Sequence, residues 1–169
     1  GQRGTRFPSR ARSLTFEVVS RLPTLRNEAI VFVAANIFGV GIASIIPAGE
    51  LSTAVNTTLP WIDARICAII IFLLGASAIG FHPVIVIISL TSVLPPEALG
   101  LSDWVVGLTY AGTWGLSTMV SPFSGTTLLM ARITKVPAHI IGWHWMLPMS
   151  AINGCVIALI IITLRHLLE

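Results

Sequence analysis

The sequence predicts an all-α, polytopic membrane protein that contains a re-entrant helical hairpin and a discontinuous transmembrane helix. The composition is 54% hydrophobic and only 10% charged, with a mean hydropathy of +0.89, whereas soluble domains have about 25% charged residues. Long apolar segments recur along the chain, and two of them are interrupted by proline, glycine and hydroxyl residues. The 169 residues suffice for one domain with three or four membrane-crossing elements.

Residues 1–26 form a basic segment, in which six arginines are opposed by Glu17 alone. Because no aromatic residues are interleaved with the arginines and an apolar segment follows directly, a cytoplasmic flank is favoured over a nucleic-acid-binding region. We therefore expect a bacterial inner (cell) membrane location with the N-terminus in the cytoplasm. Within this segment, residues 13–26 fit either an amphipathic interfacial helix or a disordered basic linker.

The apolar segments predict four membrane elements, and a loop is expected over residues 48–64. The elements are a helix at 28–47, a re-entrant hairpin at 66–94, a broken helix at 103–133 and a helix at 138–166. As one helix, residues 66–94 would span about 43 Å, which exceeds the hydrocarbon core of about 30 Å. The break at 75–83 divides them into arms 66–76 and 84–94, each about 16 Å long and able to reach the midplane.

The positive-inside rule favours this hairpin over two complete crossings. A hairpin that returns to the outside brings the end of the broken helix, with Arg132 and Lys135, to the cytoplasm. The final helix then leaves the C-terminus outside.

The two breaks carry the candidate site, and we expect them to face each other. Non-helical backbone at membrane depth is tolerated where it lines a cavity, and transporters build ion and substrate sites from such breaks. The candidate substrate- or ion-binding residues are Ser77, Gly80, His82, Ser121, Ser124, Gly125, Thr126 and Thr127. No cofactor is expected beyond a coupling sodium ion or proton.

Structural explanations compete with these roles. His82 either binds substrate or carries a proton, or else hydrogen-bonds the freed carbonyls of the turn. The hydroxyls of the second break either form a site or bond back to helix carbonyls at a kink.

No enzyme is predicted, because no catalytic constellation or metal-ligand spacing occurs. The carboxylates fall at helix ends or in loops, and no serine has a plausible His/Asp pair. Cys67 and Cys155 lie far apart in apolar runs, which predicts packing roles.

The pattern of residues 27–166 resembles one repeat of the ion-transporter superfamily, which includes divalent anion:sodium symporters and citrate carriers. The resemblance rests on a crossing helix, a hairpin with a polar tip, a helix unwound at Ser121-Pro122-Phe123-Ser124-Gly125 and a closing helix. The hairpin has Ser77-Ala78-Ile79 where those symporters carry Ser-Asn-Thr, and the unwound loop lacks their common double proline, so dicarboxylate specificity does not transfer.

The resemblance implies a C-terminal repeat whose N-terminal counterpart, or a partner subunit, completes the site. The chain begins at Gly1 rather than Met, which agrees with a partial chain. The resemblance also implies dimers, and thus a homo-oligomer, and an elevator-like movement in the lipid bilayer. The expected function is thus part of a secondary active transporter, a symporter or antiporter, moving a small anion or ion coupled to sodium or protons. The alternative is a noncatalytic membrane subunit or a small homo-oligomeric channel, in which the breaks are packing kinks.

Overall fold

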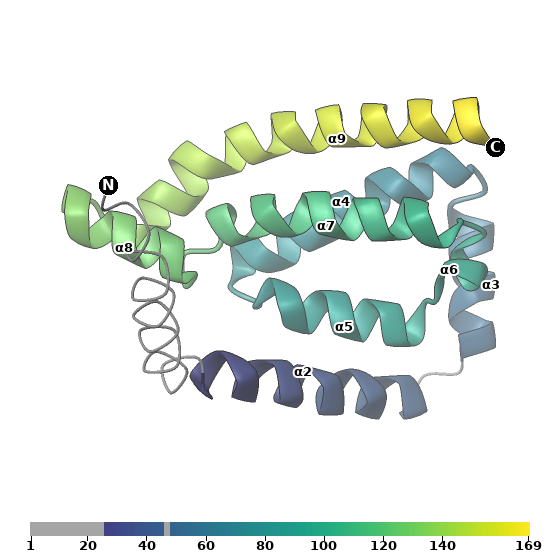
Figure 1. The fold of residues 1–169 in the computed structure, drawn as a ribbon, viewed down its shortest axis with the longest axis horizontal. Coiled ribbons are helices and arrows are strands. Elements are labelled where there is room, and N and C mark those ends of the chain that lie inside the picture. The colour runs from purple at the N-terminus through teal and green to yellow at the C-terminus, as the bar shows by residue number, and fades with distance from the viewer. Residues whose placement is uncertain (1–25, 46–47) are drawn as a thin grey trace, which may run out of the picture. The chain divides into compact units, whose positions relative to one another are not determined.

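The computed structural model describes residues 26–45 and 48–169, and its regular elements there are all helices (Figure 1). The predicted all-α class is therefore confirmed. The chain has two compact units, residues 1–34 and 35–169. The basic segment before residue 26, including most of the predicted interfacial helix at 13–26, lies outside the described residues.

The elements follow one another with short connections. They are α2 (Arg26–Ile45), α3 (Ala48–Thr58), α4 (Ile62–Ile79), α5 (Pro83–Val93), α6 (Pro96–Leu99), α7 (Asp103–Val120), α8 (Gly125–Thr134), the π-helical segment η2 (Ile140–Met146) and α9 (Leu147–Leu168).

Helix α3 replaces most of the loop that the sequence predicts at 48–64. Leu51 and Val55 lie one turn apart and pack against the hydrophobic core. The hydroxyls of Thr53 and Thr57 donate to carbonyls of the preceding turn, at 2.7 and 2.9 Å. The loop prediction was wrong because these polar side chains bond to their own helix, and Pro60 follows only after the helix has ended.

The hairpin turn is tighter than predicted. Residues 75–79 belong to α4, which ends where Gly80 adopts a left-handed conformation with φ of 111°. The Gly80 N–H donates to Ser77 O and the Phe81 N–H to Ala76 O, both at 3.0 Å, which is the Schellman arrangement. Pro83 then starts α5, where its fixed φ suits the first helical position.

The two arms of this hairpin differ in length. The 18 residues of α4 span about 27 Å, whereas the 11 residues of α5 span about 16 Å. The sequence predicted equal arms that meet at the midplane, but α4 alone nearly equals the hydrocarbon thickness of about 30 Å. The tip therefore lies at one end of the helix bundle.

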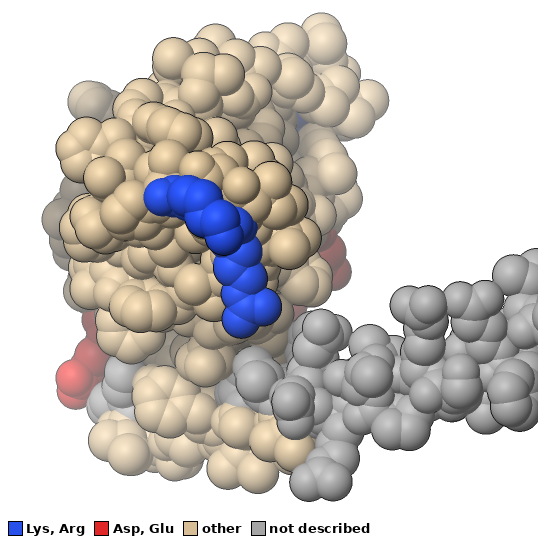
Figure 2. All heavy atoms as spheres, turned by 90° about the vertical axis from the view of Figure 1, so that its left-hand side faces the viewer, with Lys and Arg blue, Asp and Glu red and all other residues tan. Residues whose placement is uncertain are grey.

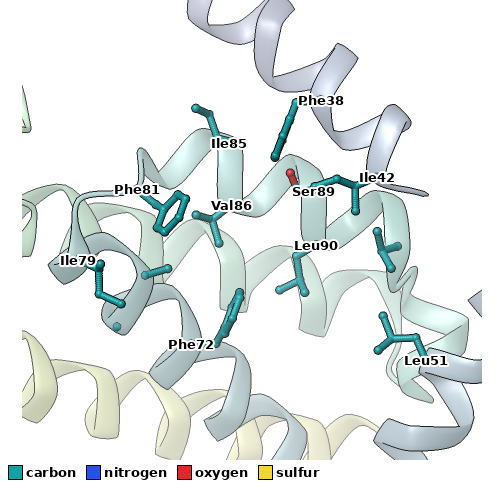
Figure 3. Close-up of a pocket in the computed structure, with 13 residues that line it drawn as sticks. Phe38, Ile42, Leu51, Phe72, Ile79, Phe81, Ile85, Val86, Ser89 and Leu90 are labelled. Atoms are coloured by element: carbon teal, nitrogen blue, oxygen red, sulfur yellow. The ribbon is translucent and has the colours of Figure 1, made fainter. Parts of the chain in front are cut away.

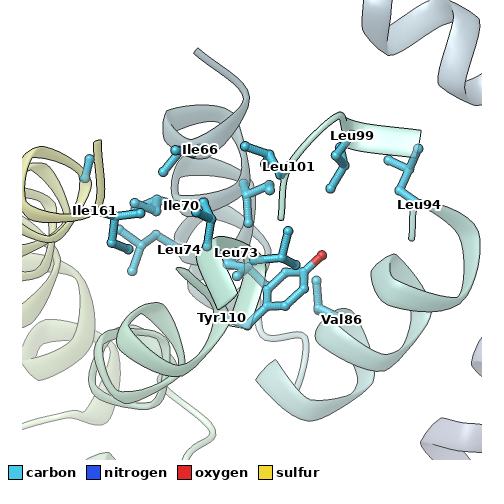
Figure 4. Close-up of a cluster of buried hydrophobic side chains, with 14 of the residues drawn as sticks. Ile66, Ile70, Leu73, Leu74, Val86, Leu94, Leu99, Leu101, Tyr110 and Ile161 are labelled. Atoms are coloured by element: carbon cyan, nitrogen blue, oxygen red, sulfur yellow. The ribbon is translucent and has the colours of Figure 1, made fainter. Parts of the chain in front are cut away.

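Helices α4, α7 and α9 pack on one another, and α5 packs against α4 and α7. Their contact faces form the core in Figure 4, in which Ile70 and Leu73 of α4 lie near Tyr110 of α7. Gly154 of α9 lies against Ile70 and Leu74, so the backbone of α9 approaches α4 closely.

Among the described residues, two helical segments are long and apolar enough to cross a membrane, namely Ile62–Ile79 and Ile140–Leu168. Only 39% and 22% of their most apolar windows are buried. Large apolar side chains such as Ile71 and Leu159 are exposed, at 70% and 65%. Burial within this fold therefore does not explain their apolar character, and membrane association is indicated.

Candidate functional site

The second break separates α7 from α8 at residues 121–124. Pro122 has no N–H to continue the helix, and its ring clashes with a helical backbone. The chain turns through a hydrogen bond from Ser124 N to Ser121 O, at 3.2 Å. Ser124 then caps α8, because its Oγ accepts a hydrogen bond from Thr127 N at 3.2 Å.

Two threonines of α8 donate hydrogen bonds to carbonyls in the last turn of α7. The Thr126 hydroxyl donates to Thr118 O at 3.4 Å, and the Thr127 hydroxyl donates to Met119 O at 3.2 Å. Ser124 Oγ donates in turn to Thr127 Oγ1, at 2.9 Å. The expectation that hydroxyls bond back to helix carbonyls is therefore correct for Thr126 and Thr127.

His82 is the N-cap of α5 at the hairpin tip. Its Nδ1 accepts a hydrogen bond from Val84 N at 3.3 Å. The sequence-based structural alternative was wrong in direction, because the ring accepts from an amide instead of donating to a turn carbonyl. An accepting Nδ1 places the proton of the neutral ring on Nε2. The exposed His82 ring can thus cap the helix and still offer a donor.

Trp143 of η2 also holds the hairpin tip. Its Nε1–H donates to Ala78 O, at 2.9 Å. Ala78 lies in the last turn of α4, where carbonyls lose their helical partners. No local sequence signal relates Trp143 to a residue 65 positions earlier.

The hairpin tip and the α7–α8 break line one cavity of about 380 Å³. It is lined by Gly80, His82, Pro83, Thr118, Ser121, Phe123, Ser124, Gly125 and Thr126. Six of the eight predicted site residues are among them. Thr118, Phe123 and Pro83 were not predicted, although Thr118 and Phe123 lie within the same polar stretch.

The other two predicted residues lie beside the cavity without lining it. Ser77 is fully buried in α4, and its hydroxyl has no hydrogen-bond partner among the described residues. Thr127 is also buried and ties the start of α8 to the end of α7. Both side chains are therefore buried between the helices and do not line the cavity.

Hydrogen-bond acceptors at the helix ends that meet the cavity are largely occupied. Beside the carbonyls that Thr126 and Thr127 engage, Ser117 O accepts from Ser121 N at 3.2 Å. At the hairpin, Ala76 O, Ser77 O and Ala78 O accept from Phe81, Gly80 and Trp143.

Three residues that line the cavity carry hydrogen-bond donors for which the described residues provide no acceptor. Within the part of the chain that the structure describes, the N–H groups of Gly125 and Thr126 in the first turn of α8 have no acceptor. The Ser121 side chain is 2% exposed, lines the cavity and makes no hydrogen bond to a described residue. The lining contains no Lys, Arg, Asp or Glu. The cavity is therefore rich in neutral donors.

Two larger hollows are apolar. One of about 560 Å³ lies among Phe38, Phe72 and Leu90 and includes a single polar side chain, Ser89 (Figure 3). Another of about 650 Å³ follows the contact between α4 and α9. Neither offers the polar groups of the tip–break cavity.

Comparison of the chain with protein-family models, curated proteins and solved structures gives no match. Among the described residues, no group of three His, Cys, Asp or Glu side chains is placed to hold a metal ion.

Proposed function

We propose that the chain is part of a secondary active transporter whose tip–break cavity binds a small anion. The main support is that one cavity joins the hairpin tip to the α7–α8 break. Its lining residues carry hydrogen-bond donors without an acceptor among the described residues, whereas most carbonyls at the ends of α4 and α7 already accept hydrogen bonds. The coupling ion is sodium or a proton.

The distribution of hydrogen-bonding groups supports an anion as the bound species. The first turn of a helix carries about half a positive charge and free N–H groups, which together bind anions. Gly125 and Thr126 supply those groups in α8, and Ser121 supplies a hydroxyl. A cation would need oxygen ligands, and the carbonyl of the lining residue Thr118 already accepts a hydrogen bond.

In this proposal the chain crosses the membrane several times and supplies one of two inverted repeats. The order of a crossing, a helical hairpin, a helix broken at Ser121–Ser124 and a closing helix supports the resemblance to the ion-transporter superfamily. An N-terminal repeat or a partner subunit completes the site around the exposed His82, and the protein functions as a homo-oligomer.

The alternative is a noncatalytic membrane subunit or a small channel. The bonds from Thr126 and Thr127 to the end of α7 favour it, because they are what a packing kink requires. It does not account for Ser121, a buried residue that lines the cavity and whose hydroxyl makes no hydrogen bond to a described residue.

Gly125→Val tests the proposal directly. A Cβ at Gly125 meets no atom within 4 Å, and Gly125 lines the cavity, so a side chain has room to be added there. Gly115→Val is the matched control, because Gly115 of α7 is equally unobstructed and does not line the cavity.

Uptake of radiolabelled acetate, lactate, succinate, citrate, phosphate and sulfate is measured with the complete protein, under imposed sodium and proton gradients. We expect uptake by wild type and Gly115→Val, and loss of uptake by Gly125→Val at equal membrane insertion. Wild-type uptake by Gly125→Val would refute the proposed site. Ion leak from liposomes that contain this chain alone, without coupled uptake, would favour the channel.

A further inference from the structure

Charges within residues 35–169 are segregated between the two ends of the helix bundle. The carboxylates are Glu50, Asp63, Glu97, Asp103 and Glu169. Asp63 and Asp103 begin α4 and α7, and Asp63 pairs with Arg165 near the end of α9 at 2.6 Å. Ser102 Oγ donates to Glu169 Oε1 at 2.5 Å, which brings the start of α7 to the same end.

The remaining two carboxylates lie near this acidic end too. Glu97 is in α6, whose Leu99 carbonyl accepts from Arg65 of α4 at 2.6 Å. Glu50 is in α3, which packs against α6. In Figure 1, α8 lies at the other end of the helices from α3 and α6.

The end that carries the breaks is basic instead. Arg132 and Lys135 are exposed in the last turn of α8 and just after it, and no described residue pairs with them. Figure 2 looks from this side and shows basic side chains at the front, whereas acidic side chains reach only its edges.

Exposed apolar side chains lie on the same helix as these two cations and on the neighbouring η2 segment. Leu129 and Ile133 of α8 are 58% and 68% exposed, and Trp145 of η2, which packs against α8, is 46% exposed. Leaving such side chains in water forfeits the free energy of their burial. Apolar and aromatic side chains mixed with cations match the boundary between acyl chains and headgroups.

We propose that this α8 surface, formed by Leu129, Arg132, Ile133 and Lys135, binds the headgroup layer of anionic phospholipids. The apolar side chains enter the acyl boundary while Arg132 and Lys135 contact lipid phosphates. The absence of carboxylates from this end within residues 35–169 makes the attraction specific for negative headgroups. This surface is separate from the cavity, so it does not depend on the transport proposal.

A simpler role exists for the two cations, since basic residues in a last helical turn offset the negative end of the helix dipole. That role predicts a change in stability and no preference between lipids. Lipid binding predicts a preference for anionic lipids and no change in stability, because each basic residue near an anionic surface strengthens binding about fivefold.

The test measures binding of fluorescent phosphatidylglycerol and phosphatidylcholine to the full chain in nonionic detergent. We expect wild type to prefer phosphatidylglycerol and to lose that preference as salt is raised. Arg132→Gln/Lys135→Gln should bind phosphatidylglycerol about thirtyfold more weakly, with phosphatidylcholine binding unchanged. Arg132→Lys/Lys135→Arg, which retains both charges, should bind both lipids as wild type does.

Equal binding of the two lipids by wild type would overturn the proposal. So would wild-type phosphatidylglycerol binding by the glutamine variant, or competition by inorganic phosphate at constant ionic strength, which would indicate a site for the free ion. Should the glutamine variant fail to fold, wild type and the charge-retaining variant are compared at rising salt. A preference for phosphatidylglycerol that does not fall with salt would then overturn the proposal.

Discussion

Phe123 of the α7–α8 break lies directly over Gly80 at the hairpin tip. A Cβ built on Gly80 would come within 2.7 Å of the Phe123 ring. The break and the turn therefore meet with no room for a side chain between them. The contact joins residues that are more than 40 positions apart in the sequence and forms one wall of the cavity.

Gly80→Ala should destabilise the protein. Gly80 has a φ of 111°, which costs a residue with a Cβ about 1–2 kcal/mol, and contact with Phe123 adds to that cost. Thermal unfolding in detergent measures the effect. Gly107→Ala is the control, because its Cβ meets no atom within 4 Å, and it should leave the melting temperature unchanged or slightly higher. Equal melting temperatures for both variants would contradict the role of the turn.

Gly142→Ala should disturb the α7–α8 break, because Gly142 of η2 packs against its backbone. A Cβ on Gly142 of η2 would lie 2.5 Å from Val120 O and 3.5 Å from Pro122 N, both of them backbone atoms. Relieving such overpacking costs about 1–3 kcal/mol. We expect lower thermal stability together with reduced uptake, while Gly115→Ala changes neither. Full uptake by Gly142→Ala would show that the break tolerates displacement.

His82→Asn separates the two roles of the hairpin-tip histidine. Asparagine is a good N-cap, so it should keep the stability of α5, whereas His82→Ala should lose about 1 kcal/mol. Asparagine lacks the imidazole Nε2–H, and we expect the apparent affinity for the transported anion to fall about tenfold. Wild-type affinity in His82→Asn would leave the ring with the capping role alone. Concentration-dependent uptake and thermal unfolding distinguish these results.

Arg65→Lys should destabilise the end of the helix bundle that lies opposite the cavity. The Arg65 side chain is 8% exposed and donates from Nε to Leu59 O at 2.9 Å and from Nη1 to Leu99 O at 2.6 Å. Lysine cannot donate both of these hydrogen bonds from one planar group. Losing one such charged hydrogen bond costs about 2 kcal/mol of folding free energy. Chemical unfolding of the variant measures the loss. The exposed Arg132→Lys serves as the comparison, and an equally small effect at both positions would contradict a structural role for Arg65.

Local chemistry made the breaks predictable from the sequence. Pro83 and Pro122 cannot continue a helix, and glycine accompanies each of them, so both interruptions were located to within a few residues. Residues 75–79 were misassigned because small residues are compatible with both a turn and a helix. Helix 48–58 was missed because its threonines hydrogen-bond within the helix, which composition does not reveal.

Tertiary contacts explain what the sequence left out of the site. Trp143 reaches Ala78 across the bundle, and Phe123 reaches Gly80, without any local signal for either contact. The sequence placed Ser77 and Ser121 in the same class of hydroxyls. Only packing shows that Ser121 lines the cavity whereas Ser77 is enclosed in the core.

In our proposal, the cavity binds an anion through the amides of Gly125 and Thr126. The most direct measurement follows these two backbone amide resonances in the 15N-labelled complete protein, while acetate, nitrate or sulfate replaces an inert buffer anion at constant ionic strength. We expect a saturable shift of both resonances with at least one anion, no shift at the Gly115 amide and no response in Gly125→Val. Unchanged Gly125 and Thr126 resonances with every anion, or an identical response in Gly125→Val, would contradict it.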